Sequence, residues 1–130
     1  MFVVLEHRCR EGTHWDFMLA FPGRERLATW RLEQDPTVAP GPIRGEPIGD
    51  HRRDYLDYEG PLSGDRGFVT RRDRGEAVVL SHNAARLRAR LEGVLLRGEI
   101  EIRHEPAGPA YFLHVSGAAG AASEPKPRQS

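Results

Sequence analysis

Turn-forming residues interrupt this chain so often that a long helix has little room to form. The 130 residues include fourteen glycines and ten prolines, and no run of apolar residues exceeds five. Glycine and proline both disfavour helix interiors, and their clusters mark turns and loops. Short apolar runs between dense turns are typical of a mostly β protein. We therefore expect a small closed or partly open β-barrel with long loops and little helix.

The length of the chain bears on the number of domains, and its charge bears on the kinds of partner it could bind. A chain of 130 residues is close to the commonest domain size, so we expect one domain over residues 1–116. Nineteen basic side chains balance nineteen acidic ones, which argues against a strongly basic, histone-like binder and against an acidic tail protein. Gly, Ala, Ser, Pro and charged residues dominate residues 117–130, which we expect to be a disordered tail.

The cysteine count and the N-terminal sequence bear on the compartment. Cys9 is the only cysteine, so the chain can form no internal disulfide and no thiolate zinc cluster. The apolar residues 1–5 are followed at once by charged and polar ones, and this run is too short for a signal peptide or a membrane span. We expect a cytoplasmic protein without a membrane partner.

Hydrophobic patterning suggests where the strands lie. Residues 14–20 alternate between two faces with the period of two that defines a strand. By composition and alternation we also expect strands at 2–5, 26–32, 67–71, 76–80, 91–95, 98–102 and 111–115. We expect a turn at Asp73-Arg74-Gly75 and a long loop over 34–49, which is rich in Pro and Gly. Helix propensity favours a helix over 84–91.

Two stretches concentrate side chains that could carry chemistry. The first holds His7, His14 and Asp16, and the last two project from the same face of a predicted strand. Two imidazoles and a carboxylate form a mixed N/O set that suits Mn, Fe or Zn, although a structural histidine at a strand end remains an alternative. The second lies at 50–60, where His51 could donate a proton or contact an oxyanion. Tyr55 would reach the same group if this segment forms a helical turn; a solvated charged turn is the alternative.

The other polar residues give weaker signals. Arg44 alone is typical of a surface arginine, and Cys9 belongs to no recognisable catalytic arrangement. His82, His104 and His114 lie in no comparable cluster and suit structural roles. The phosphate-binding glycine motifs of nucleotide-binding folds are missing from the sequence.

Taken together, three separated motifs resemble a known family. They are Phe2-Val3-Val4-Leu5-Glu6-His7, then His14-Trp15-Asp16-Phe17-Met18-Leu19, then Asp50-His51-x-x-x-Tyr55-x-x-Tyr58-Glu59-Gly60. In order and spacing they resemble the 3′-phosphoesterase domain of bacterial DNA ligase D, over residues 2–115. The chain resembles the small stand-alone proteins that carry this domain.

The resemblance implies a fold, an activity and a site. It implies a compact β-barrel that uses a divalent metal, preferably manganese, to trim DNA 3′ ends during repair. The enzyme would remove a terminal ribonucleoside and then the remaining 3′-phosphate, beside a separately encoded DNA ligase or polymerase. Residue by residue, it implies that His7, His14 and Asp16 bind the metal and that His51 and Tyr55 contact the phosphate. Arg44 lies one step from the place of a further phosphate-binding arginine.

Two departures from the family pattern bear on activity. His7 and His14 are seven residues apart where the family has six, a difference that a turn at Gly12 can absorb. Met18 stands where the family has a phosphate-clamping arginine, and methionine cannot donate a hydrogen bond to an anion. We expect Met18 to line the site. A weakly active enzyme, a non-catalytic module that binds DNA ends or a repair partner, and a phosphoesterase for another substrate class therefore all stay open.

Overall fold

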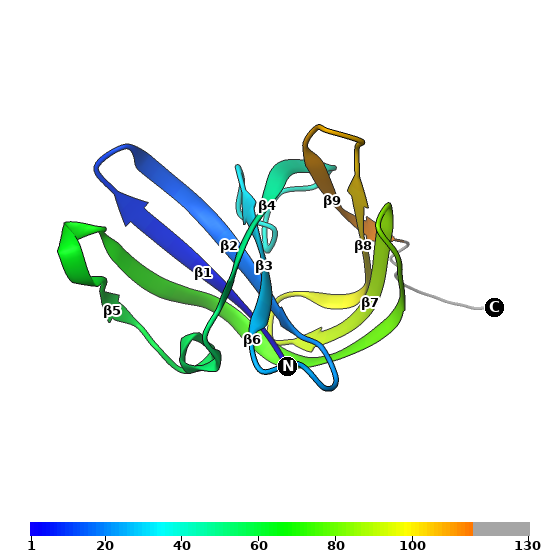
Figure 1. Cartoon of the computed structure of the whole chain (residues 1–130), viewed down its shortest axis with the longest axis horizontal. Coiled ribbons are helices and arrows are strands. Elements are labelled where there is room, and N and C mark those ends of the chain that lie inside the picture. Colours follow the sequence, from blue (N-terminus) through cyan, green and yellow to red (C-terminus); the bar gives the residue numbers. More distant parts are fainter. Residues whose placement is uncertain (116–130) are drawn as a thin grey trace.

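The computed structural model describes residues 1–115 as strands joined by turns and loops (Figure 1). Its elements are β1 (Phe2–Cys9), β2 (Gly12–Ala20), β3 (Leu27–Leu32), β4 (Ile43–His51), η1 (Arg53–Leu56), β5 (Gly60–Pro61), η2 (Ser63–Asp65), β6 (Phe68–His82), β7 (Arg86–Gly93), β8 (Arg97–His104) and β9 (Ala110–Val115). The 3₁₀ helices η1 and η2 are four and three residues long. No described helix has the length and apolar character needed to cross a bilayer. The expected tail at 117–130 lies outside the described residues.

The strands form one antiparallel sheet that closes on itself. Its order is β1-β2-β3-β4-β9-β8-β7-β6-β5, and β1 also pairs with β6. Hydrogen bonds therefore run around a ring of strands, and the short β5 is added to the outer part of β6. The sequence-based expectation of a small, mostly β fold with little helix is confirmed.

The expected turn at Asp73-Arg74-Gly75 is wrong, because these residues lie inside strand β6. The strand runs without a break for 15 residues and pairs first with β1 and then with β7. The buried Asp73 carboxylate is used elsewhere, because it accepts backbone N–H bonds from Val94, Leu95 and Leu96 in the β7–β8 turn. Gly75 is required by packing, since a Cβ there would lie 2.1 Å from the carbonyl oxygen of Glu92. Asp73 and Gly75 are therefore explained by contacts with β7 and the β7–β8 turn, and not by a local turn.

Two further expectations are wrong for a related reason. Residues 43–49, expected within the long loop over 34–49, lie in β4, in which buried Ile43 and Gly45 alternate with exposed Arg44 and Glu46. The segment favoured as a helix at 84–91 instead enters β7, where Leu87, Ala89 and Leu91 are buried at every second position. In both segments the period of two decides the structure and overrides composition and helix propensity.

Alternation along the strands separates two apolar clusters. The larger fills the ring with side chains that include Phe2, Val4, Phe17, Leu91, Ile100 and Phe112. The smaller, which we call the outer cluster, lies on the other face of β1 and β2 under η1 and the β5 region, and consists of Val3, Leu5, Met18, Leu27, Leu56 and Val69. Successive strand side chains point to opposite faces, so one hairpin contributes to both. The candidate site lies on the outer-cluster face.

Candidate metal centre and the pocket around it

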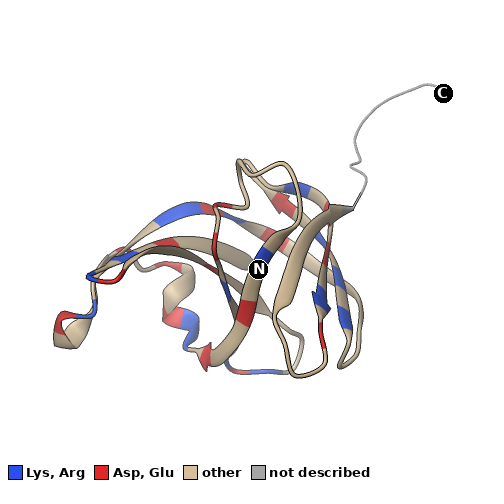
Figure 2. Cartoon of the chain, turned by 90° about the horizontal axis from the view of Figure 1, so that it is seen from above, with Lys and Arg blue, Asp and Glu red and all other residues tan. Residues whose placement is uncertain are grey.

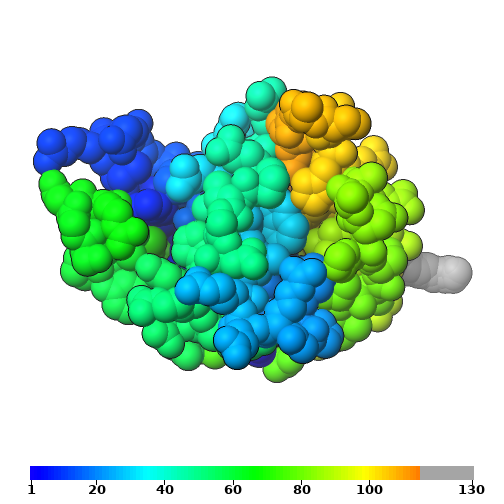
Figure 3. Space-filling view, in the orientation of Figure 1, coloured from blue at the N-terminus to red at the C-terminus, as the bar shows by residue number. Residues whose placement is uncertain are grey.

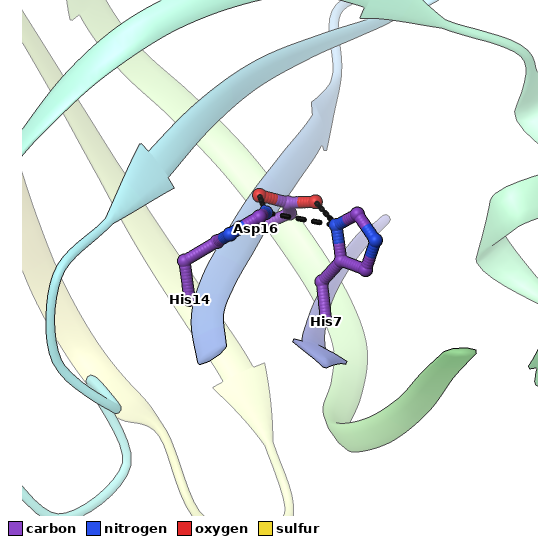
Figure 4. Close-up of side chains that lie close together, drawn as sticks. All are labelled: His7, His14 and Asp16. Atoms are coloured by element: carbon purple, nitrogen blue, oxygen red, sulfur yellow. Dashed lines mark hydrogen bonds and ion pairs between the residues drawn. The ribbon is translucent and has the colours of Figure 1, made fainter. Parts of the chain in front are cut away.

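Three metal-ligating side chains converge on the β1–β2 hairpin. His7 on β1 lies directly opposite His14 on β2 in the strand register, and Asp16 follows on the same face (Figure 4). His7 Nδ1 and His14 Nε2 are 2.8 Å apart, and Asp16 Oδ1 lies 3.4 Å from His14 Nε2. One donor atom from each residue lies within 4.8 Å of the other two, so the group could hold a metal ion.

The hairpin turn explains how a spacing of seven residues brings the two histidines together. Cys9 pairs with Gly12, which leaves only Arg10 and Glu11 in the turn. Gly12 has a φ of 134°, a conformation that L side chains rarely adopt. The turn therefore keeps His7 and His14 on the same face and in direct register.

A contact with the backbone decides which ring nitrogen of His7 carries the proton. Its Nε2 lies 2.7 Å from the carbonyl oxygen of Arg66, and a carbonyl oxygen can only accept a hydrogen bond. In the neutral ring the proton is therefore on Nε2, and the lone pair of Nδ1 points into the space between His14 and Asp16, where a cation could lie. Metal-binding histidines typically have this second contact, because it fixes the tautomer and the ring orientation.

The electrostatics of the site suit a cation. Asp16 Oδ1 is buried without a hydrogen-bond partner in the described structure. Burial raises the pKa of Asp16 to about 6, with Arg31 and His7 opposing the shift. Burial, followed by the charges of Arg31 and His7, lowers the pKa of His14 to about 4. At neutral pH the group thus offers a carboxylate and an uncharged His14 ring, the forms that ligate metals.

The pocket around this group also contains the second predicted pair. His51 at the end of β4 and Tyr55 on η1 line the same cavity of about 570 Å³ as the three ligands. Their rings meet edge to face with centroids 5.4 Å apart. The segment forms a helical turn, the 3₁₀ helix η1, which was the condition for Tyr55 to reach the same group as His51. Figure 3 shows the molecule hollowed between the blue β1–β2 hairpin and the β3–β4 segment.

His51 is held in one tautomer by Thr29. Thr29 Oγ1 donates its single hydrogen to the Leu27 carbonyl at 3.0 Å, and it lies 3.1 Å from His51 Nδ1. The hydroxyl oxygen must then accept from His51, so Nδ1 carries the ring proton and Nε2 is a free base in the neutral ring. Burial lowers the pKa of His51, which favours this neutral form.

Two other predicted residues take different places. Arg44 does not line the metal pocket; it lies in an adjoining cavity and forms a 3.5 Å ion pair with Glu33. Met18 reaches the floor of the metal pocket, as expected, but it is only 1% exposed and packs in the outer cluster.

Sequence reasoning missed Arg31, the arginine of β3 in the metal pocket. It pairs with Asp16 across β2 and β3, and its Nε lies 4.0 Å from Asp16 Oδ1. That Nε is buried and has no hydrogen-bond partner in the described structure. Alternation along residues 26–32 places the side chains of Arg31 and Trp30 on opposite faces of the strand. Only the β2–β3 register shows that Arg31 lies beside Asp16.

Comparisons of the chain with protein-family models and with curated proteins found no match. The family resemblance of the three motifs therefore stays a prediction.

Proposed function

We propose that this protein is a metal-dependent phosphoesterase that trims the 3′ ends of nucleic acid strands. Its substrates would be DNA ends with a 3′-terminal ribonucleoside or a 3′-phosphate. The main support is that His7, His14 and Asp16 line one cavity with His51, Tyr55 and Arg31. The order of the motifs, which resembles the phosphoesterase domain of bacterial DNA ligase D, selects the substrate class.

The three ligands would hold a divalent ion, with manganese favoured. A mixed set of two imidazoles and one carboxylate suits Mn²⁺ and leaves coordination positions for water and substrate. When bound, such an ion supplies Lewis-acid polarisation of a phosphoryl oxygen and lowers the pKa of a bound water. The buried, unpartnered Asp16 Oδ1 is the oxygen that such an ion would satisfy.

The remaining pocket residues would orient the phosphate and move a proton. His51, with its proton on Nδ1, can accept a proton at Nε2 from the attacking water and return it to the leaving oxygen. Tyr55 packs against this ring and offers a hydroxyl donor. Met18 stands where the resembled family has a phosphate-clamping arginine. Arg31, on the neighbouring strand β3, would supply the positive charge that Met18 lacks.

The direct test uses purified protein, Mn²⁺ and a primer-template that ends in one ribonucleotide or in a 3′-phosphate. We expect release of the nucleoside and of inorganic phosphate, and we expect a chelator, His14→Ala or Asp16→Asn to abolish it. His82→Gln is the matched control, because His82 packs against Phe21 away from the metal pocket. Undiminished activity in His14→Ala and Asp16→Asn would overturn the proposal.

A second candidate function is a non-catalytic module that binds DNA ends. The observation that favours it is the buried Met18, which stands where the resembled family has a clamping arginine. Tight binding of the same primer-template without product release, under all metals tested, would support this alternative.

A further inference from the structure

A second cavity adjoins the metal pocket and shares one residue with it. This cavity has a volume of about 560 Å³, and Arg31 lines both spaces. Its other walls come from β3, β4 and the β8–β9 turn: Glu33, Arg44, Gly45, Glu46, Ala107, Gly108 and Pro109. Neither the three motifs nor the proposed chemistry uses this cavity as a separate site.

Strand register fixes the relation between the two cavities. Asp16 on β2 pairs with Arg31 on β3, and Arg31 pairs with Glu46 on β4. Directly paired residues point to the same face, and neighbouring strands are about 4.8 Å apart. Arg44, two residues before Glu46, shares that face. The second cavity thus begins one strand away from the metal ligand Asp16.

The charges in this cavity are available to an anion. The Arg31 side chain is 43% exposed, and the closest carboxylate oxygen to its Nε, that of Asp16, lies 4.0 Å away. Arg44 and Glu33 form a 3.5 Å pair with both side chains mostly exposed, an interaction that contributes little in water. Arginine presents a planar fork that matches phosphate. Glu33 and Glu46 oppose anion binding, so removal of a glutamate charge should strengthen it.

Acidic and basic residues are interspersed over the ribbon (Figure 2), and many arginines lie within 4.0 Å of a carboxylate oxygen. On β7 and β8, for example, Arg103 lies 2.9 Å from Glu101 and Arg90 lies 3.7 Å from Glu99. Arg31 differs from these, because its closest acid is Asp16, the residue that a bound cation would neutralise. With a cation in place, Asp16 no longer competes for the Arg31 charge, and Glu33 and Glu46 are the acids that remain in the second cavity.

We infer that the second cavity binds the backbone phosphate next to the scissile one, on its 5′ side. Arg31 lies between the two phosphates, and Arg44 contacts the second. This inference rests on the proposed function and narrows it: the substrate is a strand with an internal phosphodiester, and a lone phosphomonoester is used poorly.

The test compares two substrates that differ only in the internal phosphate. With Mn²⁺, a deoxytrinucleotide with a 3′-phosphate should have a kcat/KM about tenfold to a hundredfold above that of a deoxynucleoside 3′-phosphate, the effect of one or two charge-assisted contacts. Arg44→Gln should lower this ratio about tenfold, and Glu33→Gln should raise it. Arg90→Gln is the matched control: Arg90 is also ion-paired with a glutamate and similarly exposed, 51% against 58% for Arg44.

A binding measurement separates this inference from the proposed function. Calorimetry with the same trinucleotide in Ca²⁺ should show an affinity that Arg44→Gln weakens about tenfold and Arg90→Gln does not change. If no substrate releases phosphate but this binding pattern holds, the proposed function fails and the subsite stands. Equal kcat/KM for both substrates, with affinity unchanged in Arg44→Gln, would overturn the subsite and leave the phosphoesterase intact.

Discussion

Trp30 and His104 join β3 to β8 through a hydrogen bond in which the indole Nε1–H donates to His104 Nε2 at 3.0 Å. Because Nε2 accepts, the neutral ring carries its proton on Nδ1, which is buried without a partner in the described structure. Burial lowers the pKa of His104. Protonation of Nε2 would remove the bond from Trp30, so this contact links fold stability to pH.

The first prediction is that His104 makes the fold sensitive to acid. A lowered folded-state pKa stabilises the protein above the unfolded value of about 6.5, and this stability is lost as pH falls from there toward the folded value. The free energy of unfolding should therefore decline more steeply below about pH 6.5 in the wild type than in His104→Gln. Tryptophan-detected urea melts at several pH values measure this slope. Parallel curves for the two proteins would contradict the prediction.

The second prediction concerns the pH dependence of metal binding. Asp16, with its pKa raised to about 6, must lose its proton to ligate, whereas His14, with its pKa lowered to about 4, is already neutral. The rise in Tm that Mn²⁺ produces should grow with pH through about 6 and level off above about pH 7, where Asp16 is almost fully deprotonated. Asp16→Asn should remove this rise at every pH, and His82→Gln should keep it.

The third prediction assigns Thr29 a positioning role. Thr29→Val removes the acceptor for His51 Nδ1–H, so the ring can reorient or change tautomer. We expect kcat to fall about tenfold or more, with a smaller change in KM, since general-base contributions are of order 10²–10⁴. Thr29→Ser should restore kcat because it keeps the hydroxyl. Equal loss in both variants would assign Thr29 to packing instead.

The fourth prediction concerns Met18. The sequence predicts weak but measurable Mn²⁺-dependent activity that Met18→Arg improves. The burial of Met18 in the outer cluster adds a cost: a guanidinium there is desolvated, and we expect a loss of about 1–3 kcal/mol in the free energy of unfolding. Met18→Leu, which conserves volume, should cost less than about 1.5 kcal/mol. Denaturant melts give stability, and rates per folded molecule give activity.

The fifth prediction concerns the carboxylate that organises the β7–β8 turn. Asp73→Ala leaves the N–H groups of Val94, Leu95 and Leu96 without their acceptor. Leu96 is buried, whereas Val94 and Leu95 are exposed and their N–H groups can turn to water. At about 1–3 kcal/mol for a buried unsatisfied group, the free energy of unfolding should drop by about 1–3 kcal/mol. Asp57→Ala, which removes an exposed carboxylate, should change it by less than about 1 kcal/mol. Chemical denaturation measures both.

Local alternation accounts for what the sequence could predict. The period of two over residues 14–20 places His14 and Asp16 on one face, and the structure brings His7 beside them. Here the pattern depends only on the pleat of one strand and on a short turn, so neighbouring residues carry all the information.

Long-range pairing accounts for what the sequence could not predict. Asp73 has the composition of a turn, but its partners are about twenty residues away. Arg31 reaches the metal pocket only because the β2–β3 register sets it opposite Asp16. Arg44 was expected in a loop and lies on β4, which faces the second cavity. Register is set by the whole ring, and no single segment encodes it.

The placement of all three metal donors on one hairpin has a consequence for the order of folding. On β1, Phe2 pairs with Leu19 on one side and with Gly75 on the other, so the hairpin closes a far shorter loop than the ring does. Shorter loops close at lower entropic cost and form earlier. The ligands can thus come together before His51, Tyr55 and the Arg66 carbonyl reach them. A cation present while the chain folds would stabilise this hairpin first and serve as a template for ring closure.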